Sequence, residues 1–209
     1  MARNYKINFS QRKAPKKVIY LACEGGSTGT EGSYIRDLCA KYNCTLVSNT
    51  IYKGSADPVT LANAAVDFSS KNQKRPGDNF EIWIVFDNDN QKAAKAAFAR
   101  VDGYNRNLKK NCVPVNIAFN APCIEVWGLL CCGKRPKYST AAVMQGLLKN
   151  EMPAYHHEKS PRFDFEKMEA GVDTALKIAG AWQISLANSP EYSASLFSGI
   201  YKLVESIRK

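Results

Sequence analysis

Acidic residues follow three apolar segments of this chain. Glu24 follows KVIYLAC, Asp87 and Asp89 follow EIWIVF, and Glu125 lies shortly after VPVNIAF. A hard cation such as Mg²⁺ takes oxygen ligands, commonly one or two carboxylates together with water and substrate phosphates. Carboxylates repel each other at short range unless a cation or a shared proton lies between them. These residue types therefore indicate a site for Mg²⁺, or Mn²⁺, that acts on a phosphodiester.

The spacing of Asp87 and Asp89 supports the same interpretation. Residues two apart in an extended chain point to the same side, so both carboxylates can face one ligand. A single D-x-D motif is also typical of a turn, because Asp and Asn are common turn residues. Acidic residues at the ends of several strands favour the metal site over the turn.

The elements that must position these residues alternate along the chain. Four segments have the β-branched and aromatic character of strands: Lys17–Cys23, Cys44–Lys53, Glu81–Phe86 and Val113–Phe119. A helical segment follows each, beginning near Thr30, Pro58, Gln91 and Pro122. This order predicts an α/β fold with a parallel sheet of about four strands flanked by helices. Ligands of such sheets bind beyond the carboxyl ends of the strands, where the acidic residues stand.

The last part of the chain is predicted to be helical only. The segments with helical patterns are Thr140–Lys149, Phe165–Leu186 and Tyr192–Arg208, with a loop over Met152–Arg162. We therefore expect an α/β core over residues 17–150 and a helical C-terminal extension over residues 151–209, packed on the core.

The chain is strongly basic, with a formal net charge of +10. Six Lys or Arg residues and no acid occur in residues 1–17, and further groups are Lys71, Lys74 and Arg75, then Lys109 and Lys110, then Lys134, Arg135 and Lys137. A basic excess suits a polyanion, because contacts with phosphates release counterions. It equally suits a solvated surface that keeps a protein soluble. The last two groups are the candidate nucleic-acid-binding residues.

Other patterns exclude or leave open several classes of site. The turn Gly25–Gly29 between a strand and a helix can cradle a phosphate, although no G-K-[ST] follows it as in an ATP-binding P-loop. The seven cysteines form no C-x-x-C pair, which argues against zinc. No apolar run reaches the roughly 20 residues of a membrane span, and no secretory signal is present, so we expect a cytoplasmic protein.

Four segments together resemble the RloB-like proteins, which are bacterial Toprim-domain proteins associated with phage defence and often encoded beside an ATPase. The segments are Val18–Tyr34, Ile84–Asp89, Asn120–Leu130 and Asn188–Glu205. The resemblance covers most of the chain and implies a Toprim-like sheet. It also implies a partner ATPase.

The resemblance assigns roles to individual acidic residues. Glu24 matches the Toprim glutamate, a general acid/base or metal ligand, and Asp87 and Asp89 match the paired aspartates that bind Mg²⁺. Glu31 matches a second acidic residue of the first loop, and Glu125 matches the glutamate of an N-P-C-x-E-x-W-like segment. The sequence departs from the family where Asn88 replaces a frequent Arg and where the first loop is about two residues longer.

These observations lead to two hypotheses. The first is a Mg²⁺-dependent nuclease that cleaves DNA or RNA, tRNA included, as an effector of antiviral defence by abortive infection. In it, the catalytic residues are Glu24, Asp87 and Asp89, which also hold the metal. The second is a non-catalytic subunit that binds or senses nucleic acid and docks on a partner ATPase.

Overall fold

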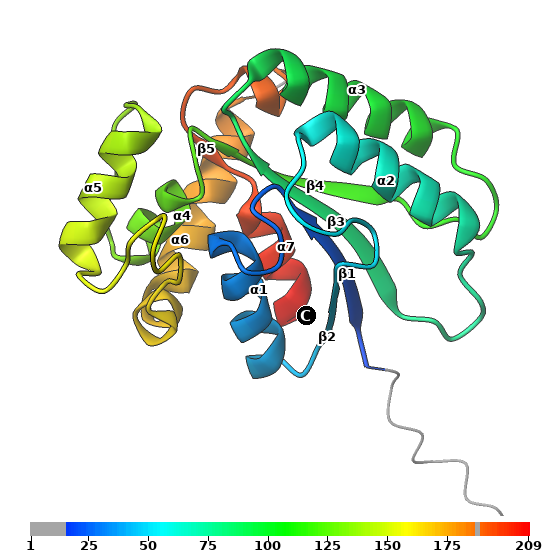
Figure 1. Ribbon diagram of the computed structural model, residues 1–209, viewed down its shortest axis with the longest axis horizontal. Helices are drawn as coiled ribbons and strands as arrows, with labels where there is room; N and C mark the ends of the chain where they lie inside the picture. Colours follow the sequence, from blue (N-terminus) through cyan, green and yellow to red (C-terminus); the bar gives the residue numbers. More distant parts are fainter. Residues whose placement is uncertain (1–15, 187–188) are drawn as a thin grey trace, which may run out of the picture.

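A five-stranded sheet forms the centre of the protein (Figure 1). The computed structural model describes residues 16–186 and 189–209. The sheet has the order β2-β1-β3-β4-β5, in which the first four strands are parallel and β5 is antiparallel to β4. The strands are β1 (Val18–Cys23), β2 (Thr45–Ser48), β3 (Phe80–Asp87), β4 (Val115–Ala121) and β5 (Phe197–Ser198). The predicted α/β fold with a parallel sheet is confirmed.

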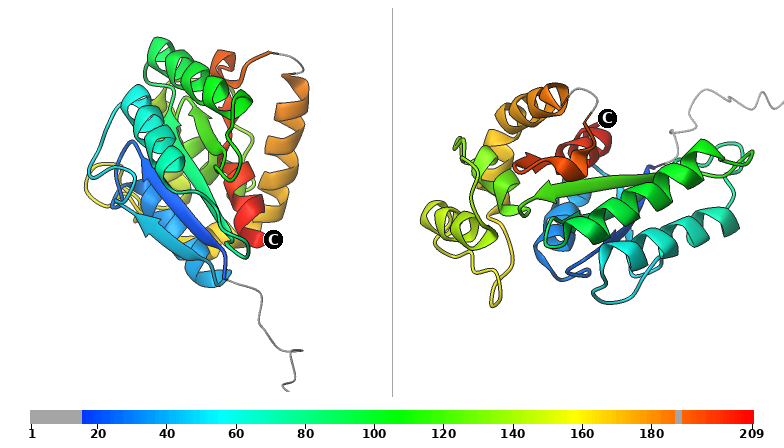
Figure 2. Two further views of the ribbon diagram at one scale, coloured as in Figure 1. Left: turned by 90° about the vertical axis from the view of Figure 1, so that its right-hand side faces the viewer. Right: turned by 90° about the horizontal axis from the view of Figure 1, so that it is seen from above.

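Helices cover both faces of this sheet, as the two views of Figure 2 show. Helices α2 (Pro58–Lys71) and α3 (Gln91–Arg106) pack together on one face, and α1 (Thr30–Lys41) and α7 (Ile200–Arg208) lie on the other. Three helices remain: α4 (Glu125–Cys131), α5 (Ala141–Glu151) and α6 (Phe165–Ser185). Helix α4 contacts both α5 and α6, and α6 also contacts α7 and β5.

The strands form because their side chains are apolar on both faces, as expected for a parallel sheet covered by helices. In β3 the side chains of Ile82, Ile84, Val85 and Phe86 are fully buried. Phe86 packs edge-to-face on Phe119, with ring centroids 5.8 Å apart. This packing fixes the position of the carboxyl end of β3, where the first candidate aspartate lies.

The C-terminal segment differs from the single helix predicted over Tyr192–Arg208. A short 3₁₀ helix, Glu191–Ser193, precedes strand β5, and only the residues from Ile200 onward are α-helical. Gly199 permits this path, because a Cβ atom there would lie 2.8 Å from the carbonyl oxygen of Phe119. The segment therefore contributes a strand to the sheet as well as a covering helix. Asn188, the first residue of the fourth matching segment, lies outside the described residues.

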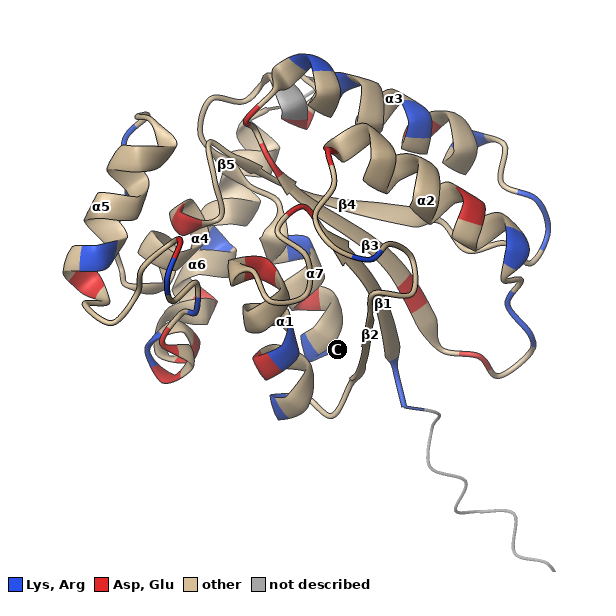
Figure 3. Cartoon of the chain, in the orientation of Figure 1, with Lys and Arg blue, Asp and Glu red and all other residues tan. Residues whose placement is uncertain are grey.

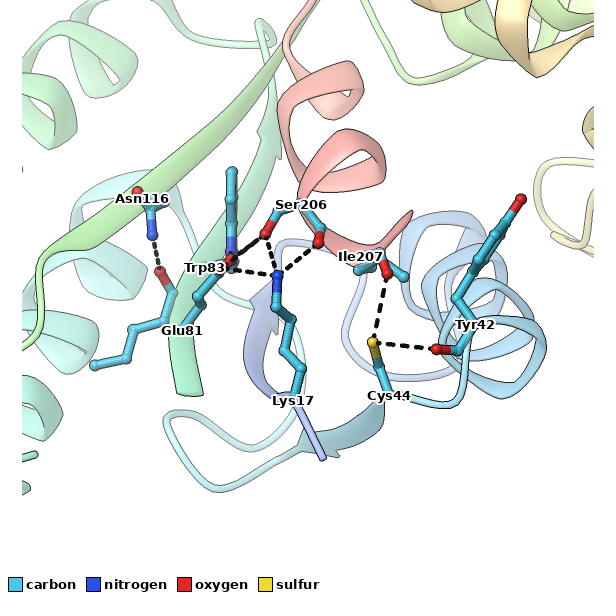
Figure 4. Close-up of polar contacts among 9 residues, drawn as sticks. Lys17, Tyr42, Cys44, Glu81, Trp83, Asn116, Ser206 and Ile207 are labelled. Carbon is cyan, nitrogen blue, oxygen red and sulfur yellow. Dashed lines mark hydrogen bonds and ion pairs between the residues drawn. The ribbon is translucent and has the colours of Figure 1, made fainter. Parts of the chain in front are cut away.

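A polar cluster attaches the end of α7 to the amino-terminal end of the sheet (Figure 4). The Lys17 ammonium donates to the carbonyl oxygen of Ser206 at 2.6 Å and forms an ion pair with Glu81 at 3.2 Å. The Ser206 hydroxyl and the Trp83 indole N–H both donate to the same Glu81 carboxylate. These donors lower the pKa of Glu81 despite its partial burial. The carboxylate thus joins β1, β3 and α7.

The backbones of α4 and α6 approach each other closely at Gly171. A Cβ atom at Gly171 would lie 1.7 Å from the carbonyl oxygen of Cys131, a distance that no structure tolerates. Since α4 also contacts α5, it packs on elements from both sides of residue 150. The division into a core and an extension at that residue stays a prediction.

We expect Gly171→Ala to destabilise the protein by about 3 kcal/mol or more, because α4 and α6 must separate to admit the methyl group. Gly180→Ala, in the same helix with nothing within 4 Å of its Cβ position, is the matched control. It should stabilise the protein by up to about 1 kcal/mol through helix propensity. Urea unfolding midpoints measure both changes, and equal midpoints for the two variants would contradict this packing.

Candidate functional site

Four acidic side chains line one pocket of about 300 Å³ at the carboxyl ends of the strands. Glu24 follows β1, Asp87 ends β3, Asp89 lies in the next turn, and Glu31 lies in the first turn of α1. Figure 3 shows acidic segments at this end of the sheet. The pocket also includes Gly25, Gly29, Thr30, His157 and Pro161. The structure therefore brings together four of the five acidic residues predicted from the sequence.

Glu24 is held by the backbone of the neighbouring strand. Its N–H donates to the carbonyl oxygen of Val85 at 3.0 Å, and its Oε2 atom accepts the N–H of Asp87 at 3.1 Å. Loss of hydration raises the pKa of Glu24, the hydrogen bond from Asp87 opposes this, and the charges of Asp89 and Asp57 raise the pKa further. A carboxyl group with a raised pKa holds its proton to higher pH than an ordinary carboxyl group, which favours a role in proton transfer.

Asp87 accepts hydrogen bonds from two donors on the adjoining strand and turn. Its Oδ1 accepts the side-chain amide of Asn120 at 3.1 Å, and its Oδ2 accepts the N–H of Ile124 at 3.2 Å. Asn120 is in turn fixed by the hydroxyl of Ser198, which donates to its Oδ1 at 2.9 Å. Residues Asp87, Asn120 and Ser198 stand opposite one another on β3, β4 and β5, so the strand pairing itself aligns them.

The two donors do not neutralise Asp87. Loss of hydration and then the charges of Glu31 and Glu125 raise the pKa of Asp87 well above its ordinary value, although the hydrogen bonds from Asn120 and Ile124 lower it. Each one-unit shift corresponds to about 1.4 kcal/mol of differential interaction between protonation states. The folded protein therefore favours a proton, or another positive charge, at this carboxylate.

Glu31 belongs to the same cluster, in spite of the longer first loop. It is 7% exposed, and its Oε2 atom lies 3.3 Å from the position of a Cβ on Gly25. Burial raises the pKa of Glu31 from 4.5 to about 7, its own N–H opposes the shift, and the charges of Glu125 and Glu24 add to it. The first loop thus folds so that this glutamate faces the other carboxylates.

Glu125 lies behind the pocket and is fully buried. Its Oε1 accepts hydrogen bonds from the Tyr155 hydroxyl at 2.5 Å and from the His157 ring at 2.9 Å, taking Nδ1 as the protonated nitrogen. Its Oε2 has no hydrogen-bond partner among the described residues. The His157 side chain is 48% exposed, so it connects this buried carboxylate to the open pocket.

His157 and Tyr155 were not predicted as site residues. The sequence places both in a loop, and the adjacent His156 and His157 lack the spacing of a zinc site. Their partner Glu125 stands about thirty positions earlier in the chain, and no local pattern relates the two segments. Only the folding of this loop over α1 and α4 brings the imidazole to the carboxylates.

The donor set fits a hard cation. Every acidic ligand candidate offers carboxylate oxygen, and no cysteine lines the pocket. Burial raises the pKa of the nearby Cys23 and Cys123 thiols, which keeps them protonated and unsuited to zinc. Within residues 16–186 and 189–209, no three His, Cys, Asp or Glu side chains are already close enough to hold a metal ion. The raised pKa values of Asp87 and Glu31 mean that their charged forms are destabilised in this pocket, and a divalent cation would stabilise those forms.

The basic candidates do not line this pocket. Lys134 forms an ion pair with Glu151 at 3.0 Å, while Arg135 and Lys137 are exposed beyond α4. Lys109 and Lys110 are exposed in the loop that precedes β4, at the opposite end of the sheet from the acidic residues. Figure 3 shows Lys and Arg residues on the loops at that end. Any contact of Lys109 and Lys110 with nucleic acid is therefore remote from the carboxylates.

The fold and the pocket together define an α/β protein with a carboxylate site at the carboxyl end of a parallel sheet. The family described as RloB-like protein matches residues 19–207, and the chain belongs to this family. Comparison with curated proteins and with solved structures gives no match in either set. In the described part of the chain, no helix is both long and apolar enough to span a membrane.

The burial of Glu31 predicts a loss of stability with rising pH. Between about pH 4.5 and 7 the folded state keeps a proton that the unfolded state has released, so the free energy of unfolding falls across this window. Glu31→Gln should therefore stabilise the metal-free protein at pH 8, by at most about 3 kcal/mol, and have little effect at pH 4.5.

Thermal unfolding in EDTA at the two pH values measures this difference. Glu205→Gln, at an exposed position of α7, is the control and should behave as the wild type at both. An equal effect of Glu31→Gln at both pH values would contradict the buried carboxylate.

Proposed function

We propose that the protein is a metal-dependent nuclease, which cleaves phosphodiester bonds of DNA or RNA. The observation that carries this proposal is the convergence of Glu24, Glu31, Asp87 and Asp89 on one pocket at the carboxyl ends of β1 and β3. A cluster of carboxylates with unfavourable mutual charge suits a site that receives a cation together with a phosphate.

Asp87, Asp89 and Glu24 are the residues that would hold Mg²⁺ or Mn²⁺. A bound divalent cation supplies Lewis-acid polarisation of a phosphoryl oxygen. Asn120 and Ile124 keep the Asp87 carboxylate in a fixed orientation, so little reorganisation is needed when ligands enter. The Oε2 atom of Glu24 is engaged by the Asp87 N–H, which leaves Oε1 to accept a proton from an attacking water.

His157 is the proton donor that we assign to the leaving oxygen. Its Nδ1 atom is engaged by Glu125, which fixes the ring and leaves Nε2 for the pocket. The Glu125 carboxylate holds the imidazole so that Nε2, when it carries a proton, can donate that proton to a departing alkoxide. The Tyr155 hydroxyl, which shares the Glu125 oxygen, keeps the carboxylate in place.

The family supports a proposal for the biological setting. Membership of the RloB-like family, together with the resemblance to its defence-associated Toprim proteins, supports a role as an effector of antiviral defence with a partner ATPase. A cytoplasmic location suits the seven cysteines, all of which are unpaired thiols. In this setting the substrate is nucleic acid of the infected cell or of the phage.

Asp87→Asn should abolish cleavage. The change removes a negative charge and a strong oxygen ligand while keeping the shape of the side chain, and a loss of at least about 10³-fold in rate is expected. The free energy of unfolding should change by no more than about 1 kcal/mol, because relief of repulsion offsets one weakened hydrogen bond. Asp67→Asn, at an exposed position of α2, is the control.

Purified proteins incubated with DNA and RNA, with Mg²⁺, Mn²⁺ or EDTA, give the measurement. Cleavage that persists in EDTA, or in the folded Asp87→Asn protein, would contradict the proposal. A folded Asp87→Asn protein with full defence activity in cells would instead support the non-catalytic subunit.

His157→Gln should lower cleavage of nucleic acid by about 10²-fold or more, in the range of general acid catalysis. The same variant should retain activity on bis(p-nitrophenyl) phosphate, since its leaving group departs without a proton. The neighbouring His156→Gln, whose ring lies outside the pocket lining, is the matched control and should behave as the wild type with both substrates. Equal losses of His157→Gln on the two substrates would rule out the proton-donor role.

A further inference from the structure

A second and larger pocket lies at the amino-terminal end of the sheet. It has a volume of about 730 Å³ and lies between the starts of β1 and β3, the loop over residues 71–79, and Asn111. The carboxylate pocket lies at the other end of the same strands. The run of β3 from Phe80 to Asp87 spans about 23 Å at the usual rise per residue. The two pockets therefore belong to separate sites.

The lining of this pocket is basic. Four of its side chains are cationic, Lys16, Lys71, Lys74 and Arg75, and all four are exposed. Within the part of the chain that the structure describes, none of them forms an ion pair. The lining has one acid, Asp78, and its carboxylate accepts the N–H of Arg75 at 2.8 Å. That carboxylate closes the turn, and the four cations with this one acid leave the lining a formal charge of +3.

A backbone hydrogen bond holds the loop over residues 71–79, whose cationic side chains are exposed. The N–H of Lys74 donates to the carbonyl oxygen of Asn111 at 2.7 Å, which ties the loop to the segment before β4. The exposed pair Lys109 and Lys110 stands on that segment, immediately before Asn111. The positive groups at positions 71–75 and 109–110, separate in the sequence, thus stand on two segments that this hydrogen bond joins.

Two aromatic rings line the pocket. Tyr20 and Phe80 are partly exposed and line it, with their ring centroids 5.5 Å apart in an edge-to-face arrangement. The ring of Phe68 packs on the ring of Tyr20, with their centroids 4.9 Å apart. The Lys74 ammonium lies 6.0 Å from the centroid of the Phe80 ring. The amides of Asn72, Gln73 and Asn111 complete the lining with hydrogen-bond donors and acceptors.

We propose that this pocket binds a segment of single-stranded nucleic acid. Unpaired cations attract the phosphates, aromatic rings stack on bases whatever their sequence, and amides can reach base edges; proteins that bind single strands combine these features. The proposal adds a binding site to the protein, and it stands whether or not the carboxylate pocket cleaves.

The test measures binding without cleavage. Fluorescence anisotropy of 12-nucleotide single-stranded RNA and DNA of mixed sequence is followed with the full chain in EDTA, over a series of salt concentrations. The variants are Lys74→Gln with Arg75→Gln, which removes two exposed charges, and Phe80→Leu, which keeps an apolar side chain but removes the ring. Lys149→Gln with Lys177→Gln, two exposed positions on α5 and α6, matches the first variant in net charge.

The double variant of the loop should weaken binding at least about 10-fold at low salt and reduce the slope of log affinity against log salt by about 1.4. Phe80→Leu should weaken binding about 5- to 100-fold. The control should stay within about twofold of the wild type.

Equal affinity of the loop variant and the control would overturn the proposal. The proposal would also be overturned if AMP displaced the oligonucleotide when the two are present at equal concentrations of nucleotide units. The site would then hold a free nucleotide and not a strand. If the affinities are as expected but the protein does not cleave nucleic acid, the proposed nuclease activity is contradicted and the proposed binding site is not.

Discussion

The Asp87 carboxylate, aligned by hydrogen bonds across three strands, is the feature on which the candidate site depends. Ser198 on β5 orients Asn120 on β4, and Asn120 donates to Asp87 on β3. The strand that supplies Ser198 comes from the last part of the chain, so the site is complete only when the C-terminal segment has joined the sheet. The ion pair of Lys17 and Glu81, with Ser206, fixes α7 at the other end of the same strands. Formation of the complete site therefore requires the C-terminal segment to be in place.

Near these hydrogen bonds the protein holds several carboxyl groups whose charged forms are energetically unfavourable. Burial and mutual repulsion raise the pKa values of Glu24, Glu31 and Asp87, and the favourable hydrogen bonds to these groups are too few to reverse the shifts. A large apolar core compensates, since the central strands and the helices on both faces are buried. Destabilised groups held in place by a stable scaffold are typical of functional sites, because a ligand that relieves the repulsion then binds more strongly.

Much of this arrangement could be predicted from the sequence, for identifiable reasons. The strands alternate with helices and end in acidic residues, and parallel strands place their carboxyl ends together, so the grouping of Glu24 with Asp87 followed from chain order alone. Strand β5 could not be predicted, because two residues show no periodicity and their pairing with β4 depends on tertiary contact. The contact of His157 with Glu125 was missed for the same reason. The remote position of Lys109 and Lys110 could have been predicted, since they precede β4 and the acidic residues follow strands.

The two ends of the sheet differ in charge and in chemistry, and this difference constrains how they can cooperate. Their separation of about 23 Å along β3 is too long for one nucleotide to contact both, so only a polymer can. The connecting strands β1 and β3 are buried and paired on both sides, which leaves no hinge between the ends. Contacts at the basic end would thus be the same in the ground state and in the transition state of a reaction at the acidic end. Binding energy of that kind lowers KM without raising kcat. Under the two proposals, the amino-terminal pocket would hold the strand, and the rate of the chemical step would depend on the carboxylates and His157.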